Sequence, residues 1–200
     1  MTPKCADFVL LPFVFGLTIS TTPLADAEYC LLRSEAAVRL PADGDAVKMA
    51  PLMCAGVTVH NGIRKMNIAP GETVAIQGLG GLGHLAVQYA RKMGYRTVAL
   101  SRGTDKKDFA MKLGATDYID TSKEDPAEAL QKMGGAALIV ATAPSPDHIS
   151  PLVGGCKALG KLLILARKFS PSTFPTRCAI TTVFESDRSC LALCLLCHGW

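Results

Sequence analysis

Three glycines with the spacing G-x-G-x-x-G stand between an apolar segment, 73–77, and a segment with helical periodicity. In a strand, turn and helix of this kind, Gly78 permits a tight turn, Gly80 lets the main chain approach a pyrophosphate, and Gly83 lets helix and strand pack closely. The phosphates lie at the helix N-terminus, where N–H groups without intrahelical partners and the helix dipole stabilise anions. We therefore expect five residues of this turn to bind a dinucleotide: Gly78, Gly80, Gly81, Leu82 and Gly83.

The residues after the glycines support this interpretation. Between 82 and 93, apolar residues recur every three or four positions, which predicts a helix that packs on a sheet. Gly94 is the expected residue just beyond that helix, and 96–100 is the next apolar strand. The order of strand, glycine turn, helix and strand is that of a dinucleotide-binding unit. A purely structural turn without a ligand is the alternative.

The end of the second predicted strand indicates which dinucleotide binds. An NAD site places Asp or Glu about 20 residues beyond the glycines, where the carboxylate accepts hydrogen bonds from the ribose. This chain has Ser101 and Arg102 there, followed by Lys106 and Lys107. The guanidinium of Arg102 can bind a 2′-phosphate through its planar fork, and Ser101 can donate as well. We expect NADP(H), with Ser101, Arg102 and Lys106 at its extra phosphate; an ordinary solvated helix entry is the alternative.

Helices and strands alternate through the rest of the central segment. The predicted strands are 73–77, 96–100, 118–120, 137–140 and 161–165. The predicted helices between them are 82–93, 105–113, 126–133 and 146–159. This alternation implies right-handed crossovers and a parallel sheet covered on both faces. We expect an α/β fold, a doubly wound parallel sheet (Rossmann) of about five strands, with its ligand crevice at the carboxyl ends of the strands.

Changes in composition divide the chain into four segments. Residues 1–27 contain an apolar run and small residues that resemble a secretory signal. A buried strand or an aberrant start of the coding sequence is the alternative there. Residues 28–45 contain a predicted strand, 28–32, and a turn, and they form the edge of another unit. Residues 46–166 form the dinucleotide-binding domain. It begins with a buried helix, interrupted near Pro51 and Gly56, that runs to about Met66.

Residues 167–200 form a divergent tail in which the alternation stops. Four of the eight cysteines lie there, namely Cys178, Cys190, Cys194 and Cys197. This uneven distribution argues against a disulfide framework, so we expect reduced thiols. The segment 194–198 fits a c-type haem attachment pattern, and the whole cluster contains zinc-binding residue types. Only Gly199 and Trp200 follow, so we favour chance cysteines in a read-through or alternatively spliced terminus.

Charge and hydropathy exclude two classes of partner. The net charge of +4 is small, and no Lys/Arg run alternates with aromatic residues, so we expect no nucleic-acid partner. No stretch is long enough for a confident membrane span. We expect a cytoplasmic protein, because a nicotinamide cofactor is scarce outside cells. A secreted, cysteine-rich protein is the alternative if residues 1–27 are a signal peptide.

Four short motifs together resemble those of the medium-chain, zinc-dependent alcohol dehydrogenases. The resemblance covers about residues 27–166 and is closest to the cinnamyl-alcohol and fungal NADP-dependent branch. The motifs are APLMCAGVT (50–58), PGETVAI (70–76), GLGGLGH (78–84) and SR (101–102). They are specific in combination.

The resemblance implies an NADP(H)-linked interconversion of a small-molecule alcohol with an aldehyde or ketone. In the family, a zinc ion polarises the substrate oxygen while the nicotinamide delivers or accepts hydride. Cys54 matches the family's third catalytic zinc ligand, and Thr58 matches the residue beside the nicotinamide ring. Ala141 and Thr142 match the loop that lies along the nicotinamide half of the cofactor.

The sequence departs from the family before the glycine turn. There the family has a complete GroES-like catalytic domain with the other zinc ligands, and residues 28–45 match only a remnant of it. Catalytic zinc needs three protein ligands, so Cys54 alone leaves the set incomplete. His84 opens the phosphate-binding helix and His60 falls within a helix, so we expect neither to replace the missing ligands.

The expected protein is therefore an NADP(H)-dependent oxidoreductase truncated at both ends, active only if the missing ligands come from elsewhere. A non-catalytic dinucleotide-binding fragment is the alternative. An uncovered edge strand and a missing domain interface also favour association into a homo-oligomer.

Overall fold

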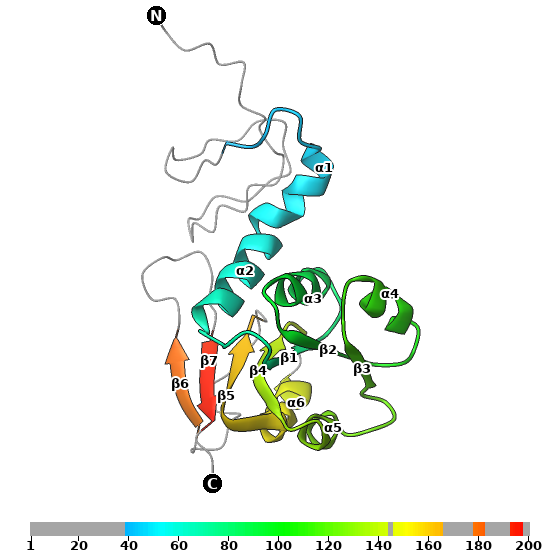
Figure 1. The fold of residues 1–200 in the computed structure, drawn as a ribbon, viewed down its shortest axis with the longest axis vertical. Coiled ribbons are helices and arrows are strands. Elements are labelled where there is room, and N and C mark those ends of the chain that lie inside the picture. Colours follow the sequence, from blue (N-terminus) through cyan, green and yellow to red (C-terminus); the bar gives the residue numbers. More distant parts are fainter. Residues whose placement is uncertain (1–38, 144–145, 166–177, 183–192, 198–200) are drawn as a thin grey trace, which may run out of the picture.

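The computed structural model describes residues 39–143, 146–165, 178–182 and 193–197 of the 200-residue chain. The strands are β1 (Thr73–Gln77), β2 (Arg96–Ser101), β3 (Asp117–Asp120), β4 (Ala136–Ala141), β5 (Cys156–Ile164), β6 (Cys178–Thr182) and β7 (Leu193–Cys197). The α-helices are α1 (Ala46–Met49), α2 (Ala55–Lys65), α3 (Gly83–Lys92), α4 (Lys107–Lys112), α5 (Pro126–Lys132) and α6 (Pro146–Ile149). Two 3-10 helices are η3 (Ala50–Met53) and η4 (Ser150–Gly155). Figure 1 shows the elements in chain order.

The described strands form one sheet in the order β3-β2-β1-β4-β5-β7-β6. Neighbours among β1 to β5 pair in parallel, which confirms the predicted doubly wound sheet. β1 lies between β2 and β4, so the winding direction reverses at β1. In open α/β sheets, ligands bind at this switch point, outside the carboxyl ends of the strands.

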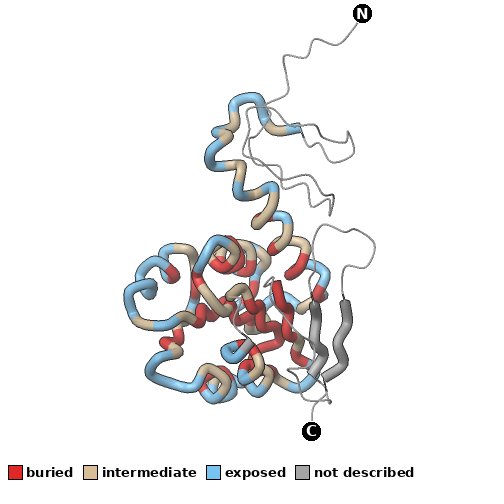
Figure 2. Tube along the Cα trace, turned by 180° about the vertical axis from the view of Figure 1, so that it is seen from behind, coloured by how far each residue is buried: buried red, intermediate tan, exposed pale blue. Residues whose placement is uncertain are grey.

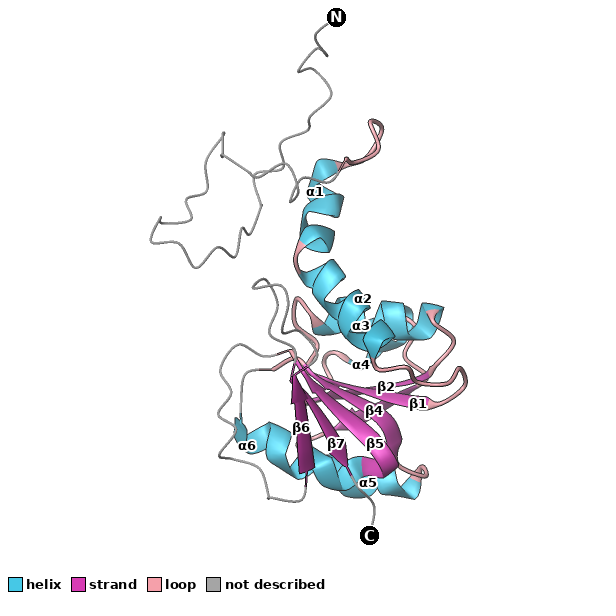
Figure 3. Cartoon of the chain, turned by 90° about the vertical axis from the view of Figure 1, so that its left-hand side faces the viewer, coloured by secondary structure: helices cyan, strands magenta, loops and turns pink. Residues whose placement is uncertain are grey.

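Both faces of the parallel part are covered. Figure 3 shows α2, α3 and α4 on one face and α5 and α6 on the other. Val74 and Ile76 of β1 pack toward the first face, and Ala75 between them packs toward the second. All six residues of β4 are buried, as a central parallel strand requires. Figure 2 shows the buried residues concentrated along the sheet.

Helix ends form where the residue types predict them. The Asp125 carboxylate accepts hydrogen bonds from Ala127 N at 2.8 Å and Glu128 N at 3.0 Å, and Pro126 occupies the first turn of α5. Gly94 follows α3 with φ of +87°. This left-handed conformation closes a helix at little cost only in glycine.

The helix predicted at 146–159 is wrong in most of its length. α6 ends at Ile149, and a 3-10 helix leads to Gly155, because Pro151 has no N–H to donate to an α-helical ladder. β5 then begins at Cys156, earlier than predicted. A Cβ on Gly160 would fall 2.7 Å from the Ala136 carbonyl oxygen, so close backbone packing, which periodicity does not reveal, sets the course of β5.

The predicted buried helix from residue 46 is also corrected. The interruption predicted near Pro51 is confirmed, because α1 ends at Met49 and the 3-10 helix η3 follows with Pro51 in its first turn. A second break falls at Cys54, between η3 and α2, whereas Gly56 itself lies within α2 beside the Tyr89 hydroxyl. α1 contains no buried residue and projects away from the sheet (Figure 1), with Val47 83% exposed. An apolar composition therefore does not make this part of the chain a buried helix.

β6 and β7, which were not predicted from the sequence, extend the sheet beside β5 in antiparallel register. The register pairs Cys178 with Cys197. The segment 1–27, the strand predicted at 28–32 and Cys190 lie outside the described residues. Of the predicted remnant 28–45, the structure describes residues 39–45, which contain a turn and lead into α1.

Candidate dinucleotide-binding site

The glycine turn joins the end of β1 to the start of α3 at the carboxyl edge of the sheet. Gly78 has φ of +89°, and its N–H donates to the Leu100 carbonyl oxygen of β2 at 2.9 Å. A Cβ on Gly83 would fall 1.8 Å from the Gly78 carbonyl oxygen. Strand and helix can approach this closely only because residue 83 has no side chain.

The outer part of the turn is open. A Cβ on Gly80 or Gly81 would meet no described atom within 4 Å, and both residues are exposed. α3 starts after Leu82, and no side chain of the described residues caps it. The first turn of a helix carries N–H groups without intrahelical partners, so this end can bind an anion.

The loop after β4 is bonded to the glycine turn. The Thr142 hydroxyl lies 2.8 Å from the Gln77 carbonyl oxygen and 3.2 Å from that of Gly78, and Thr142 N donates to Gln77 O at 3.0 Å. The Gln77 side chain accepts from Ala143 N at 3.2 Å. The structure thus brings Ala141 and Thr142 together with the glycines, across the switch point between β1 and β4.

The loop after β2 carries the predicted phosphate ligands. Ser101 ends β2 half-buried, and Arg102 is exposed, with Nη2 3.3 Å from Nε2 of His148 in α6. Lys106 is exposed at the start of α4. Arg102 follows β2, and His148 lies in α6, which follows β4. Because β2 and β4 lie on either side of β1, the two residues approach each other at the edge of the sheet that holds the glycine turn.

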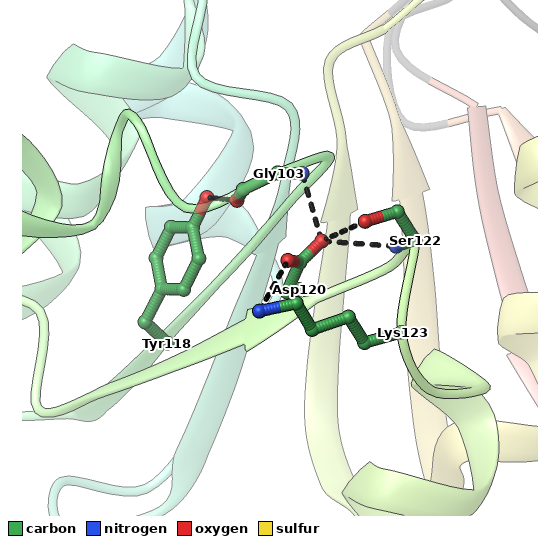
Figure 4. A network of polar contacts seen from close by, with 5 residues as sticks. All are labelled: Gly103, Tyr118, Asp120, Ser122 and Lys123. Carbon is green, nitrogen blue, oxygen red and sulfur yellow. Dashed lines mark hydrogen bonds and ion pairs between the residues drawn. The ribbon is translucent and has the colours of Figure 1, made fainter.

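A network under this loop centres on Asp120 at the end of β3 (Figure 4). Its Oδ1 accepts from Gly103 N at 2.7 Å, Ser122 N at 3.0 Å and Ser122 Oγ at 2.6 Å. The Tyr118 hydroxyl donates to the Gly103 carbonyl oxygen at 2.6 Å. The Ser122 hydroxyl, more than any other group, lowers the pKa of Asp120 below the ordinary aspartate value.

The Asp120 carboxylate is not a free group at this edge of the sheet. Asp120 is only 8% exposed, and Oδ1 already accepts three hydrogen bonds. Oδ2 is buried, with the Lys123 ammonium 3.8 Å away. The carboxylate next to β2 is therefore buried, and its accepting oxygen is engaged by donors of the protein itself.

Sequence reasoning missed four residues of this edge: Gln77, Tyr118, Asp120 and His148. A signal was available for Asp120, because an Asp two residues before a Ser at a strand end is typical of a local side-chain turn. The parallel register that pairs Ser101 with Asp120 is what brings this turn under the loop after β2. For Gln77 and His148 the sequence has no corresponding pattern.

Cys54 and Thr58, carried over from the family resemblance, lie one helical turn apart at the start of α2. Thr58 N donates to the Cys54 carbonyl oxygen at 3.1 Å. The part of the chain that the structure describes contains no group of three or more His, Cys, Asp or Glu side chains that could hold a metal ion. His60 instead makes an edge contact with Tyr89, at 5.5 Å between ring centroids.

Comparison with known proteins decides the family. The family model described as zinc-binding dehydrogenase matches residues 81–188, more than half of the chain. The chain belongs to the zinc-binding dehydrogenase family. The resemblance to zinc-type alcohol dehydrogenases is thereby confirmed.

Relatives within this family are similar over the same part of the chain. Alcohol dehydrogenase patD of Aspergillus clavatus is 70% identical over 140 residues, which are 70% of this chain and 36% of the relative. Alcohol dehydrogenase notN of an Aspergillus species is 55% identical over 75% of this chain and 44% of the relative. The chain thus spans about two fifths of the length of the curated relatives it matches.

Solved structures of the family show the same fold. The alcohol dehydrogenase of Aeropyrum pernix is 30% identical with a TM-score of 0.62, covering 70% of this chain and 42% of that one. A cinnamyl alcohol dehydrogenase of Sorghum bicolor is 30% identical with a TM-score of 0.59, covering 67% of this chain and 38% of that one.

Within the described residues, no helix has the length and apolar character needed to cross a bilayer.

Proposed function

We propose that this chain is the cofactor-binding part of an NADP(H)-dependent oxidoreductase that interconverts a small-molecule alcohol and an aldehyde or ketone. The observation that carries the proposal is the glycine turn at the switch point. A side chain at Gly83 would collide with the main chain, whereas a side chain at Gly80 would meet no described atom within 4 Å. The names of the fungal relatives, both alcohol dehydrogenases, support the reaction class.

The diphosphate of the cofactor is assigned to the open side of the turn. Gly80 and Gly81 leave space there, and the N-terminus of α3, which starts after Leu82, supplies N–H donors and the positive end of the helix dipole. A side chain at residue 80 would occupy the position we assign to a phosphate. The cradle therefore fits the group that the family implies.

The adenosine 2′-phosphate is assigned to Ser101, Arg102 and Lys106. A guanidinium binds phosphate oxygens in bidentate fashion, and Lys106 adds a second cation. The buried and bonded state of Asp120 supports NADP(H) over NAD(H), because this carboxylate is engaged within the protein and is not offered to the ribose hydroxyls.

The nicotinamide half is assigned to the loop after β4 and to α2. Ala141 and Thr142 border the glycine turn, and Thr58 is assigned to the nicotinamide ring. Bound NADP(H) supplies hydride transfer at the nicotinamide, while the protein binds and orients the ring.

The alcohol or aldehyde is the small-molecule partner, and a second copy of the chain is the proposed partner for the exposed apolar residues of α1 and α2, Val47 and Val57.

The described residues do not fit a catalytic zinc ion, because Cys54 is not joined there by two further ligands. We therefore derive no chemical step through zinc. Metal analysis of the purified chain separates catalysis from the second candidate function, a dinucleotide-binding fragment without chemistry. About one tightly bound zinc per chain supports the enzyme, and a metal-free chain that binds NADPH supports the fragment.

The test of cofactor choice is a fluorescence titration with NADPH and NADH. Arg102→Ala is expected to weaken NADPH binding by about tenfold to a hundredfold, the worth of charge-assisted hydrogen bonds, and NADH binding by less than about twofold. Arg91→Ala, an exposed guanidinium at the other end of α3, is the matched control and should change neither. Equal losses for both cofactors from Arg102→Ala would contradict the 2′-phosphate assignment. A folded chain with no affinity for either would contradict the site.

A further inference from the structure

Gly103 is held from both sides by side chains of β3. Its N–H donates to Asp120 Oδ1 at 2.7 Å, and its carbonyl oxygen accepts from the Tyr118 hydroxyl at 2.6 Å (Figure 4). Gly103 has φ of +76°, so the chain turns sharply at this point. The peptide group whose N–H is bonded to Asp120 is the one that joins Arg102 to Gly103. The Tyr118 hydroxyl bonds the next peptide group, which joins Gly103 to Thr104. The two bonds thus fix Gly103 on both sides, and with it the direction in which the Arg102 side chain leaves the main chain.

Asp120 is itself held rigidly. Besides Gly103, its Oδ1 accepts from the main-chain N–H and the hydroxyl of Ser122, and the residue is 92% covered, with 8% exposed. Burying a carboxylate costs free energy unless hydrogen bonds compensate for lost water. Here the compensating donors include the main-chain N–H of Gly103, in the loop that carries Arg102. Ser122 itself is exposed and adds no core packing.

A long side chain that binds a ligand loses rotamer freedom, and a fixed backbone reduces that loss. Arg102 has an exposed side chain whose guanidinium lies 3.3 Å from His148. The main-chain anchor at Gly103, together with this contact to His148, restricts where the guanidinium can reach.

We infer that Asp120 and Tyr118, with Ser122 behind them, are positioning residues: they hold Gly103 by its N–H and its carbonyl oxygen, so position Arg102 for the adenosine 2′-phosphate, and thereby set the preference for NADP(H) over NAD(H). This inference rests on the proposed function. The three residues touch no cofactor atom in this scheme; they act through Arg102. Their effect should therefore be seen in selectivity and vanish when Arg102 is absent.

The test uses the full chain and measures dissociation constants for NADPH and NADH by fluorescence. Tyr118→Phe keeps the ring and removes only the hydroxyl, and it should weaken NADPH about fivefold with NADH unchanged. Asp120→Ala should weaken NADPH binding about tenfold. Asp120→Asn, which retains an acceptor at Oδ1, should keep most of the wild-type affinity for NADPH. If Asp120→Ala does not fold, Ser122→Ala replaces it as the variant that tests the contact made by Asp120.

A double-mutant cycle separates positioning from general destabilisation. In an Arg102→Ala background, Tyr118→Phe should have no further effect on NADPH affinity. Independent, additive losses in the two backgrounds would overturn the inference, as would a NADPH to NADH ratio that Tyr118→Phe and Asp120→Ala leave unchanged. The proposed function fails separately: if the wild-type chain binds neither dinucleotide, or if Arg102→Ala leaves its selectivity unchanged, then the NADP(H) assignment itself is wrong.

Discussion

Thr142, the first residue after β4, donates its hydroxyl to the Gln77 carbonyl oxygen at the end of β1, at 2.8 Å. The two residues are 65 positions apart in the chain. Their bond spans the point at which the sheet reverses its winding, and a second, longer contact reaches Gly78. The shape of the glycine turn therefore depends on a strand from the other half of the sheet.

Thr142→Val is expected to lower the free energy of unfolding by about 1 kcal/mol, since one partly buried hydrogen bond is lost without a change in volume. The affinities for NADPH and NADH should fall by the same factor, because both cofactors depend on the glycine turn. Urea unfolding and dinucleotide titration check this, with Thr142→Ser as the control that keeps the hydroxyl. A selective loss of NADPH alone would contradict the role of Thr142 in the turn.

Gly83→Ala and Gly80→Ala form a matched pair with opposite expectations. The added Cβ at residue 83 meets a main-chain oxygen at 1.8 Å, and we expect a loss of about 3 kcal/mol in stability. At residue 80 the Cβ meets no described atom within 4 Å and φ is not positive, so stability should hold or rise by about 0.5 kcal/mol.

Cofactor affinity should respond differently in this pair. Gly80→Ala should bind NADPH and NADH at least about tenfold more weakly while staying folded, because the methyl group occupies the space assigned to the diphosphate. Thermal unfolding and fluorescence titration give both quantities. If Gly80→Ala bound both cofactors as tightly as the wild type, the open side of the turn would not be the phosphate site.

Asp125→Ala should cost about 1 kcal/mol of stability, because Asp125 accepts hydrogen bonds from two N–H groups at the start of α5. Asp125→Asn, which retains the accepting oxygen, is expected to recover most of it. Neither change should alter the NADPH to NADH ratio, which urea midpoints combined with titration can verify. A shift in that ratio would mean that α5 also influences cofactor choice.

The lowered pKa of Asp120 makes stability depend on pH in the acid range. The unfolded chain takes up this proton near pH 4, the usual aspartate range, while the folded chain resists it to lower pH. The contribution is therefore fully present above about pH 5 and declines as the pH falls through 4 toward the folded pKa. Asp120→Asn should flatten this decline in urea midpoints measured from pH 6 to 3. An unchanged slope would assign the decline to other carboxylates.

Much of the parallel sheet could be predicted because its signals are local. β4 is a continuous apolar run, and β1 and β2 each contain one at their centre; Gly94 and Asp125 mark helix ends through conformational and hydrogen-bonding preferences of single residues. The segment 146–159 was wrong because Pro151 and the glycines after it permit several backbone courses. The choice among them depends on close packing against α5 and β4, as at Gly155, where a Cβ would fall 2.9 Å from Leu130.

By itself, the sequence determined the alternation of strands and helices from β1 to β4, the glycine turn and the cations after β2, because each depends on residues adjacent in the chain. Only the tertiary structure decided which side chains support them. Asp120 lies under Gly103 and Thr142 lies on Gln77 because parallel pairing places the carboxyl ends of distant strands at one edge. The exposure of Val47 was likewise decided in three dimensions, since burial depends on what packs against a helix and not on its composition.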